Sequence, residues 1–142
     1  MSHTAKVFLV AAGETLVQAA HSASYEAGWW HGAASPGNVV DFRAEVRART
    51  RFGIALANEK IALIHSEVSE ALEGFRKDKA DEHLPHRKSV EVELADAVIR
   101  IADLAGAMQL DLGGAIAEKM AYNASRADHK PEGRAAAGGK AF

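Results

Sequence analysis

The chain has 142 residues and a formal net charge of −2, so it can bury a core but lacks the excess charge that attracts nucleic acid or anionic membranes. It contains no cysteine, which excludes disulfides, thiol catalysis and zinc–thiolate sites and is consistent with a reducing cytosol. The longest apolar run near the start, residues 7–12, ends at Gly13 and is too short for a membrane span or a signal peptide. We therefore expect a cytoplasmic protein without a nucleic-acid or membrane partner.

The first third of the chain is predicted to contain one clear helix. Alanine is abundant, β-branched runs are short and apolar residues recur at helical spacing, which favours an all-α protein. The first helix is expected over residues 14–28, and the Gly, Ser and Pro residues at 32–37 should end it in a loop. Residues 39–51 are ambiguous and are compatible with a further short helix.

Two longer amphipathic helices are predicted in the middle of the chain, at residues 52–77 and 90–108. In each helix apolar residues alternate at steps of three and four, which predicts a buried seam. The polar loop between them contains Pro85, and Ser89 is a candidate N-cap for the second helix. The seams comprise Ile54, Ala57, Ile61, Ile64, Val68, Ala71 and Phe75 in the first helix and Leu94, Ala97, Ile101, Leu104 and Met108 in the second.

A final helix is expected over residues 112–126, with Asp111 as its N-cap. Four amphipathic helices with short connections predict a four-helix bundle or a close relative of one, as a single domain over residues 1–129. A second subunit is expected to cover the exposed part of the wide apolar faces. Residues 130–142 are rich in Gly, Ala and charge, and we expect them to form a flexible tail or a lid.

Two pairs of acidic residues lie beside the seams of the two long helices. Glu67 and Glu70 are three residues apart, and so are Glu93 and Asp96, so each pair shares one face of its helix. If the two helices pack by their seams, the four carboxylates should face one another across the interface. The sequence therefore predicts a concentration of negative charge between the helices.

Few basic residues balance these carboxylates. Residues 61–75 contain no Lys or Arg, and residues 90–105 contain only Arg100. Buried ions without partners cost roughly several kcal/mol each, so a cation is expected to neutralise them. An all-oxygen site suits Mg²⁺, Mn²⁺ or Ca²⁺, and Mg²⁺ commonly keeps positions open for water and phosphates. No Glu has a His three residues later, which disfavours a di-iron site. Alternatively, the acidic faces stay solvated or dock a basic partner.

The segments "EVSE" at 67–70 and "ELAD" at 93–96 resemble the E-x-x-E…E-x-x-D signature of the MazG-like all-α nucleoside triphosphate pyrophosphohydrolases. The similarity extends through "ALIHSEVSEALEGFR", "VEVELADAVIRIADLAG" and "AIAEKMAYNASR" and covers residues 53–126. It implies a helical bundle that assembles as a dimer or tetramer and cleaves nucleoside triphosphates to a monophosphate and pyrophosphate. It also implies that Mg²⁺, with Mn²⁺ as a substitute, is held by Glu67, Glu70, Glu93 and Asp96.

Further site residues are suggested by what such a reaction needs. A carboxylate should orient or deprotonate the attacking water, and the sequence does not choose between Glu67 and Glu70 for this role. The resemblance implies that the last helix supplies substrate contacts. Lys119, Asn123 and Arg126 share one face of that helix and are expected to bind phosphate, unless they form a plain solvated face.

The adjacent tryptophans Trp29 and Trp30 have two interpretations. They are expected either to stack on a nucleobase or to close the core or a subunit contact. The leading function is thus a Mg²⁺-dependent pyrophosphohydrolase of undamaged or damaged nucleoside triphosphates. Two alternatives are a non-catalytic helical protein that docks a basic partner, and the same fold and metal with a phosphoribosyl pyrophosphate-linked substrate, as in some members of the family.

Overall fold

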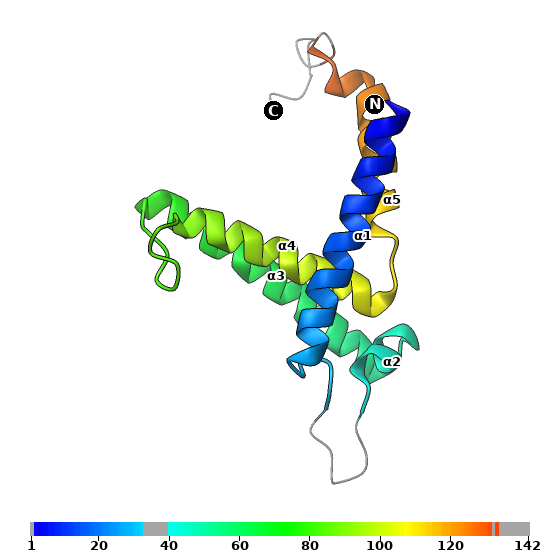
Figure 1. The fold of residues 1–142 in the computed structure, drawn as a ribbon, viewed down its shortest axis with the longest axis vertical. Coiled ribbons are helices and arrows are strands. Elements are labelled where there is room, and N and C mark those ends of the chain that lie inside the picture. Colours follow the sequence, from blue (N-terminus) through cyan, green and yellow to red (C-terminus); the bar gives the residue numbers. More distant parts are fainter. Residues whose placement is uncertain (1, 33–39, 132, 134–142) are drawn as a thin grey trace. The chain divides into compact units, whose positions relative to one another are not determined.

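The described part of the chain contains helices and no strands. A computed structural model describes residues 2–32, 40–131 and 133 (Figure 1). The all-α prediction is confirmed over these ranges. Most of the predicted tail or lid at 130–142 lies outside the described residues. The elements are α1 (His3–Glu26), α2 (Phe42–Arg47), α3 (Arg51–Lys77), α4 (Ser89–Met108), α5 (Leu112–Ser125) and a 3-10 helix (Ala127–His129).

Helix α1 starts well before the predicted helix at residues 14–28. Glycine is a poor helix residue, which is why Gly13 was expected to lie outside the helix. In the structure Gly13 lies within α1, and its missing side chain allows α5 to approach closely. A Cβ at Gly13 would lie 2.6 Å from the Cα of Gly113, and a Cβ at Gly113 would lie 2.6 Å from the carbonyl oxygen of Val10. Close helix packing therefore outweighs the low helix propensity of glycine here.

Side-chain caps define the starts of three helices. The carboxylate of Asp41 accepts a hydrogen bond from the backbone N–H of Arg43 at 2.9 Å, at the start of α2. The hydroxyl of Thr50 caps α3 in the same way. Asp111 caps α5, as predicted. The prediction that Ser89 caps α4 is wrong: the preceding residue, Lys88, takes the N-cap position, and Ser89 is buried as the first helical residue.

The chain divides into two compact units. One unit comprises Met1–Thr15 and Asp111–Phe142, and therefore holds the first half of α1 together with α5. The other, Leu16–Leu110, holds the second half of α1 and helices α2, α3 and α4. The predicted single domain over residues 1–129 spans both units and stays a prediction. In the described ranges, no helix combines the length and apolar character that a membrane crossing requires.

The unit Leu16–Leu110 is built on an antiparallel hairpin of α3 and α4, with α2 packed against both helices (Figure 1). A hydrophobic core joins this hairpin to the segment after α1. Its buried members are Trp30, Val46, Leu104 and Ala107. Leu56, Ala57 and Ile64 of α3 pack against these buried residues, so the core contacts both helices of the hairpin.

The seam predicted on α3 splits into two rows. Residues seven apart on a helix differ by about 20° in azimuth, whereas residues three apart differ by about 60°. One row turns inward: Ala71 is buried, and Ala57 and Ile64 pack against the core. The other row turns outward and is 42–71% exposed, so the prediction that it is buried is wrong for the single chain. The outward row comprises Ile54, Ile61, Val68 and Phe75.

The seam predicted on α4 divides in a similar way. Ala97 and Leu104 are buried, whereas Leu94 and Ile101 are exposed. Val98, close to Leu94 on the helix surface, is also exposed. The α3–α4 hairpin therefore leaves an apolar face uncovered in the single chain.

Candidate metal and phosphate site

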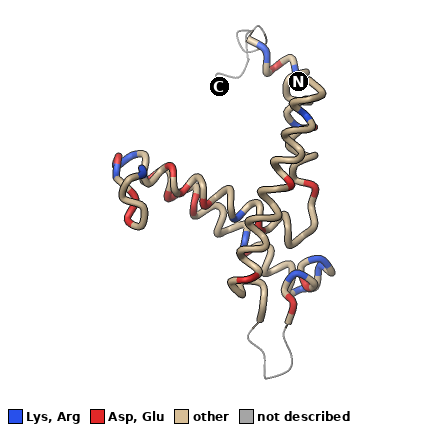
Figure 2. Tube along the Cα trace, viewed as in Figure 1, with Lys and Arg blue, Asp and Glu red and all other residues tan. Residues whose placement is uncertain are grey.

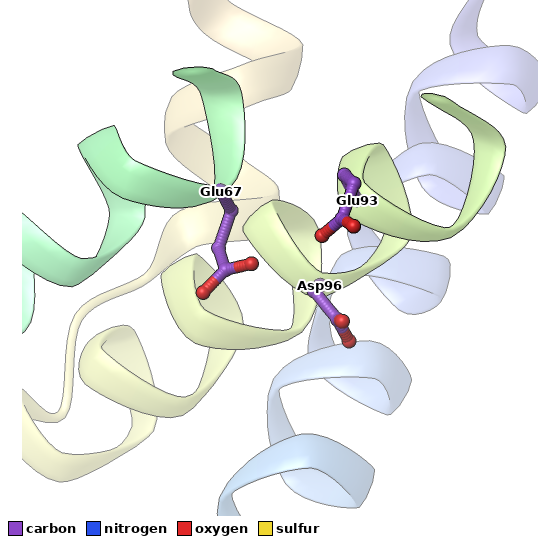
Figure 3. A group of neighbouring side chains, drawn as sticks. All are labelled: Glu67, Glu93 and Asp96. Carbon is purple, nitrogen blue, oxygen red and sulfur yellow. The ribbon is translucent and has the colours of Figure 1, made fainter. Parts of the chain in front are cut away.

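Three carboxylates meet between α3 and α4. Glu67 projects from α3, and Glu93 and Asp96 project from α4 (Figure 3). One carboxylate oxygen from each lies within 4.8 Å of the others. Glu67 is only 6% exposed, so its charge is largely removed from water. The hairpin thus brings together three of the four residues predicted to hold a metal.

The fourth predicted ligand, Glu70, does not join this three-residue group in the structure. It lies on the exposed side of α3, one helical turn beyond Glu67, and lines the same cavity as the group. Figure 2 shows acidic residues along the middle of the α3–α4 hairpin, and both basic and acidic residues at its loop end. Glu70 therefore belongs to the acidic cavity, and its role as a direct ligand stays a prediction.

The cavity around the carboxylates has a volume of about 590 Å³. This is within the usual range of about 300–1,000 Å³ for sites that hold a small organic ligand. Helices α3 and α4 form its acidic wall, and the loop between them adds Lys79, Asp81 and His83. The cavity is therefore large enough for a cation together with a phosphorylated small molecule.

The loop residues of the cavity were not foreseen from the sequence. The carboxylate of Asp81 accepts hydrogen bonds from the backbone N–H groups of His83 at 2.9 Å and Leu84 at 2.7 Å. The backbone N–H of Asp81 donates to the carbonyl oxygen of Arg87 at 3.0 Å. An aspartate followed by a Pro-containing polar run signals such a turn. That signal predicts a folded loop but not that the loop turns back over the carboxylates.

The carboxylates around the cavity repel one another, because they carry the same charge and lie close together. Burial raises the pKa of the Glu93 carboxyl above its ordinary value, and the nearby carboxylates of Glu70, Glu67, Asp96 and Asp81 raise it further. One direct counter-ion is present: Nε of Arg100 lies 2.6 Å from Oε1 of Glu67. Glu93 therefore carries a proton more readily than an exposed glutamate does.

This pKa shift predicts how the stability of the metal-free protein depends on pH. Between the ordinary pKa of glutamate and the raised pKa of Glu93, the folded protein keeps a proton that the unfolded chain has released. Stability should therefore fall as the pH rises through this range. The Glu93→Gln variant has no carboxyl to ionise at this position. It should therefore melt at a higher temperature than the wild type at neutral pH, in buffer containing a chelator.

Thermal melts of both proteins across a pH series measure this difference. Glu91→Gln is the matched control, because Glu91 lies on the same helix but is exposed and paired with Arg87 at 2.7 Å. The control should not raise the melting temperature. If Glu93→Gln follows the wild-type pH profile, the ionised Glu93 does not destabilise the folded protein.

The two tryptophans have different environments. Trp30 is fully buried, and its indole N–H donates to Oδ1 of Asp103 at 2.7 Å. Nδ1 of His21 lies 2.8 Å from the same oxygen. The ring of Trp30 thus has no open face for a base, so the structure supports its alternative role in the core. Sequence adjacency gave no way to separate Trp30 from Trp29.

Trp29 is 69% exposed and lines a second cavity of about 310 Å³. Lys60 also lines this cavity, and Asp96 and Arg100 line both this cavity and the acidic one. The two cavities therefore meet along α4. The prediction that Trp29 stacks on a nucleobase fits this position and stays a prediction.

The residues predicted to bind phosphate from the last helix lie in the other compact unit. The ammonium of Lys119 lies 4.8 Å from the centre of the Tyr122 ring. The guanidinium of Arg126 donates two hydrogen bonds to the carboxylate of Asp128. The side-chain oxygen of Asn123 is buried and has no hydrogen-bond partner within the part of the chain that the structure describes. Contact of these residues with a substrate stays a prediction.

No protein-family model, curated protein or solved structure matches this chain. What the site does must therefore be inferred from its own chemistry.

Proposed function

We propose that the protein is a Mg²⁺-dependent nucleoside triphosphate pyrophosphohydrolase with a MazG-type helical fold. The observation that carries this proposal is the group formed by Glu67, Glu93 and Asp96, which come from two helices and share one cavity. Glu67 is buried and Glu93 and Asp96 are partly buried, and carboxylates that approach this closely are stabilised in their ionised form by a cation. The resemblance of their sequence segments to the E-x-x-E…E-x-x-D signature supports the same assignment.

The donor atoms fit a hard divalent cation. Mg²⁺ is a hard cation that prefers carboxylate and water oxygens as ligands. The three carboxylate oxygens already lie within 4.8 Å of one another, so Glu67, Glu93 and Asp96 would hold one such ion after small side-chain movements. Mn²⁺ has similar ligand preferences and is an expected substitute. A bound cation would neutralise the phosphate oxygens and the leaving pyrophosphate.

We assign water activation to Glu70 in preference to Glu67. Glu67 is buried and paired with Arg100, whereas Glu70 is exposed to the cavity and outside the three-residue group. In the proposed step, water attacks one of the two phosphorus atoms of the α,β bridge, and its proton passes to the Glu70 carboxylate. The bond from that phosphorus to the bridging oxygen breaks, and the bridging oxygen leaves with the other phosphate. The products are a nucleoside monophosphate and pyrophosphate.

The second cavity is a natural place for the nucleoside. It adjoins the acidic cavity through Asp96 and Arg100, and the exposed indole of Trp29 lines it. A base stacked on an aromatic ring is stabilised by about 1–3 kcal/mol, largely without regard to its identity. The triphosphate would then extend from this cavity toward the carboxylates.

The test of this function is a hydrolysis assay with pure protein, Mg²⁺ and a panel of nucleoside triphosphates, both ribose and deoxyribose, undamaged and damaged. We expect at least one substrate to yield monophosphate and pyrophosphate, and no turnover in the presence of a chelator. A phosphoribosyl pyrophosphate-linked compound belongs in the panel, because the same metal and fold would suit it. Release of single phosphate groups instead of pyrophosphate would contradict the proposal.

We also propose that a second copy of the chain covers the apolar face of the α3–α4 hairpin. Helix α3 exposes the outward row defined above together with Leu72, and α4 exposes Leu94, Val98 and Ile101. On both helices these residues point away from the carboxylates, because they are displaced by about 80–140° from Glu67 on α3 and by about 140–160° from Asp96 on α4. A group of exposed apolar side chains of this size is typical of a protein–protein interface. A homodimer or homotetramer would bury it and leave the acidic cavity open.

A charge placed in this face should prevent assembly. We expect Val68→Lys to convert the wild-type oligomer to a monomer, because Val68 lies in the middle of the outward row and is half exposed in the single chain. Sedimentation velocity measures the change. Ala62→Lys is the control, since Ala62 is exposed on the same helix but about 80–140° away from that row, and about 120° away from Val68. A wild-type protein that sediments as a monomer would contradict this proposal without affecting the proposed chemistry.

A further inference from the structure

We propose that Arg100 is an exchangeable counter-ion of the site. Without a divalent cation it pairs with Glu67, and when cation and triphosphate bind it releases Glu67 and pairs with a substrate phosphate. This inference rests on the proposed function. It assigns a positioning role to a residue that neither the acidic signature nor the predicted phosphate-binding face of the last helix includes.

Arg100 and Glu67 are in direct contact. Nε of Arg100 lies 2.6 Å from Oε1 of Glu67, and the two side chains differ greatly in exposure, 42% for Arg100 and 8% for Glu67. The buried carboxylate is held in place by its surroundings, whereas the arginine reaches it from solvent on a long side chain. If the pair separates, Arg100 is therefore the partner that moves.

Arg100 and a divalent cation would compete for the Glu67 carboxylate. Glu67 is also a member of the three-residue group that could hold a cation. A guanidinium and a divalent cation on the same carboxylate would repel each other strongly in a partly desolvated site. Binding of the cation should therefore weaken the ion pair between Glu67 and Arg100. In turn, Arg100 should lower the affinity for the cation when no substrate is present.

The released side chain of Arg100 lies where a substrate phosphate would bind. Arg100 follows Asp96 by one helical turn and lines both cavities. Of the other basic residues in these walls, Lys79 lines only the acidic cavity and Lys60 only the second one. A triphosphate that joins the two cavities would pass Arg100. A guanidinium suits phosphate oxygens because it donates two parallel hydrogen bonds.

The experiment compares metal binding with substrate binding. Mn²⁺ alone is titrated into the full-length wild type, Arg100→Gln and Arg100→Lys, and free Mn²⁺ is followed by electron paramagnetic resonance. We expect Arg100→Gln to bind Mn²⁺ more tightly, on the order of tenfold, and its KM for the best triphosphate to rise, also on the order of tenfold. Arg100→Lys keeps the charge, so its Mn²⁺ affinity should be close to the wild-type value and its KM intermediate. Arg87→Gln, which removes an exposed arginine outside both cavities, should change neither quantity.

The opposite directions of the two effects separate exchange from a purely structural role, which would weaken both kinds of binding. If the wild type binds Mn²⁺ and hydrolyses triphosphate but Arg100→Gln binds Mn²⁺ no more tightly, the exchange is overturned and the proposed function stands. If Arg100→Gln binds Mn²⁺ tightly with an unchanged KM, the transfer to phosphate is overturned. If the wild type neither binds Mn²⁺ nor hydrolyses any triphosphate, the proposed function fails and the exchange fails with it.

Discussion

Under the proposed function, the Asp96→Asn variant should lose about 100-fold or more of the Mg²⁺-dependent kcat/KM. It should also lose the rise in melting temperature that we expect Mg²⁺ to give the wild type. Asp96 is one of the three residues whose carboxylate oxygens converge, and it also borders the second cavity. An amide in place of the carboxylate removes one negative charge from a cation site. Metal-ion catalysis supplies several kcal/mol of transition-state stabilisation, and each 1.36 kcal/mol is about tenfold in rate.

The control for this experiment is Glu82→Gln. Glu82 lines the same acidic cavity but is exposed and lies outside the three-residue group. The Glu82→Gln variant should keep both the hydrolysis and the Mg²⁺-dependent stabilisation. The comparison therefore distinguishes the loss of a metal ligand from the loss of any negative charge in the cavity. If Asp96→Asn still gains stability from Mg²⁺ as the wild type does, the metal site lies elsewhere.

The same measurements test the non-catalytic alternative, in which the acidic faces dock a basic partner or stay solvated. That alternative predicts no Mg²⁺- or Mn²⁺-dependent rise in the wild-type melting temperature. It also leaves the Glu67–Arg100 pair as a permanent structural contact. A metal-dependent rise that is lost in a Glu93→Gln/Asp96→Asn double variant would argue against it.

Replacing Trp30 should lower the stability of the fold, whereas replacing Trp29 should affect substrate binding. Trp30→Ala should destabilise the protein by about 3–5 kcal/mol, since it removes a fully buried aromatic ring from the core. It also removes the indole N–H that donates a hydrogen bond to Asp103. Trp29→Ala should change the free energy of unfolding by no more than about 0.5 kcal/mol, because its ring is exposed. If Trp29 stacks on the base, its KM for the triphosphate should rise on the order of tenfold.

Chemical denaturation and steady-state kinetics measure these effects. Trp30→Phe is the informative second variant, because it should still fold. It keeps most of the ring volume and leaves Asp103 with one donor fewer, a loss of about 1–3 kcal/mol. Its KM should match the wild-type value. A KM for Trp30→Phe as high as that of Trp29→Ala would show that Trp30 contacts the substrate, contrary to its burial in the core.

The helices of this protein were largely predictable because they depend on local signals. The seams on α3 and α4, the polar loop between them and the cap at Asp111 placed helices close to the observed ones. The start of α1 was not predicted, because Gly13 lies inside the helix, where another glycine packs against it. Ser89 failed as a cap for a similar reason: its side chain is buried against α3 instead of turned back to the helix end.

The candidate site was predictable in composition but not in arrangement. The three-residue spacing of Glu67 and Glu70, and of Glu93 and Asp96, follows from helical geometry and is visible in the sequence. Which of these carboxylates converge depends on the register of α3 against α4. Spacing alone made Glu70 and Glu67 equally good candidates for metal ligands, whereas packing buries Glu67 and leaves Glu70 exposed.

The sequence by itself determined the helices, the acidic pairs and the shortage of nearby basic residues, because these depend on residues within a few turns of one another. Only the tertiary structure decided which half of each seam is buried, which tryptophan belongs to the core and which arginine reaches Glu67. Those outcomes depend on contacts between residues far apart in the chain, such as Glu67 with Arg100 and Trp30 with Asp103. Helical periodicity determines which face of a helix carries a side chain, whereas packing between helices determines which residues that face contacts.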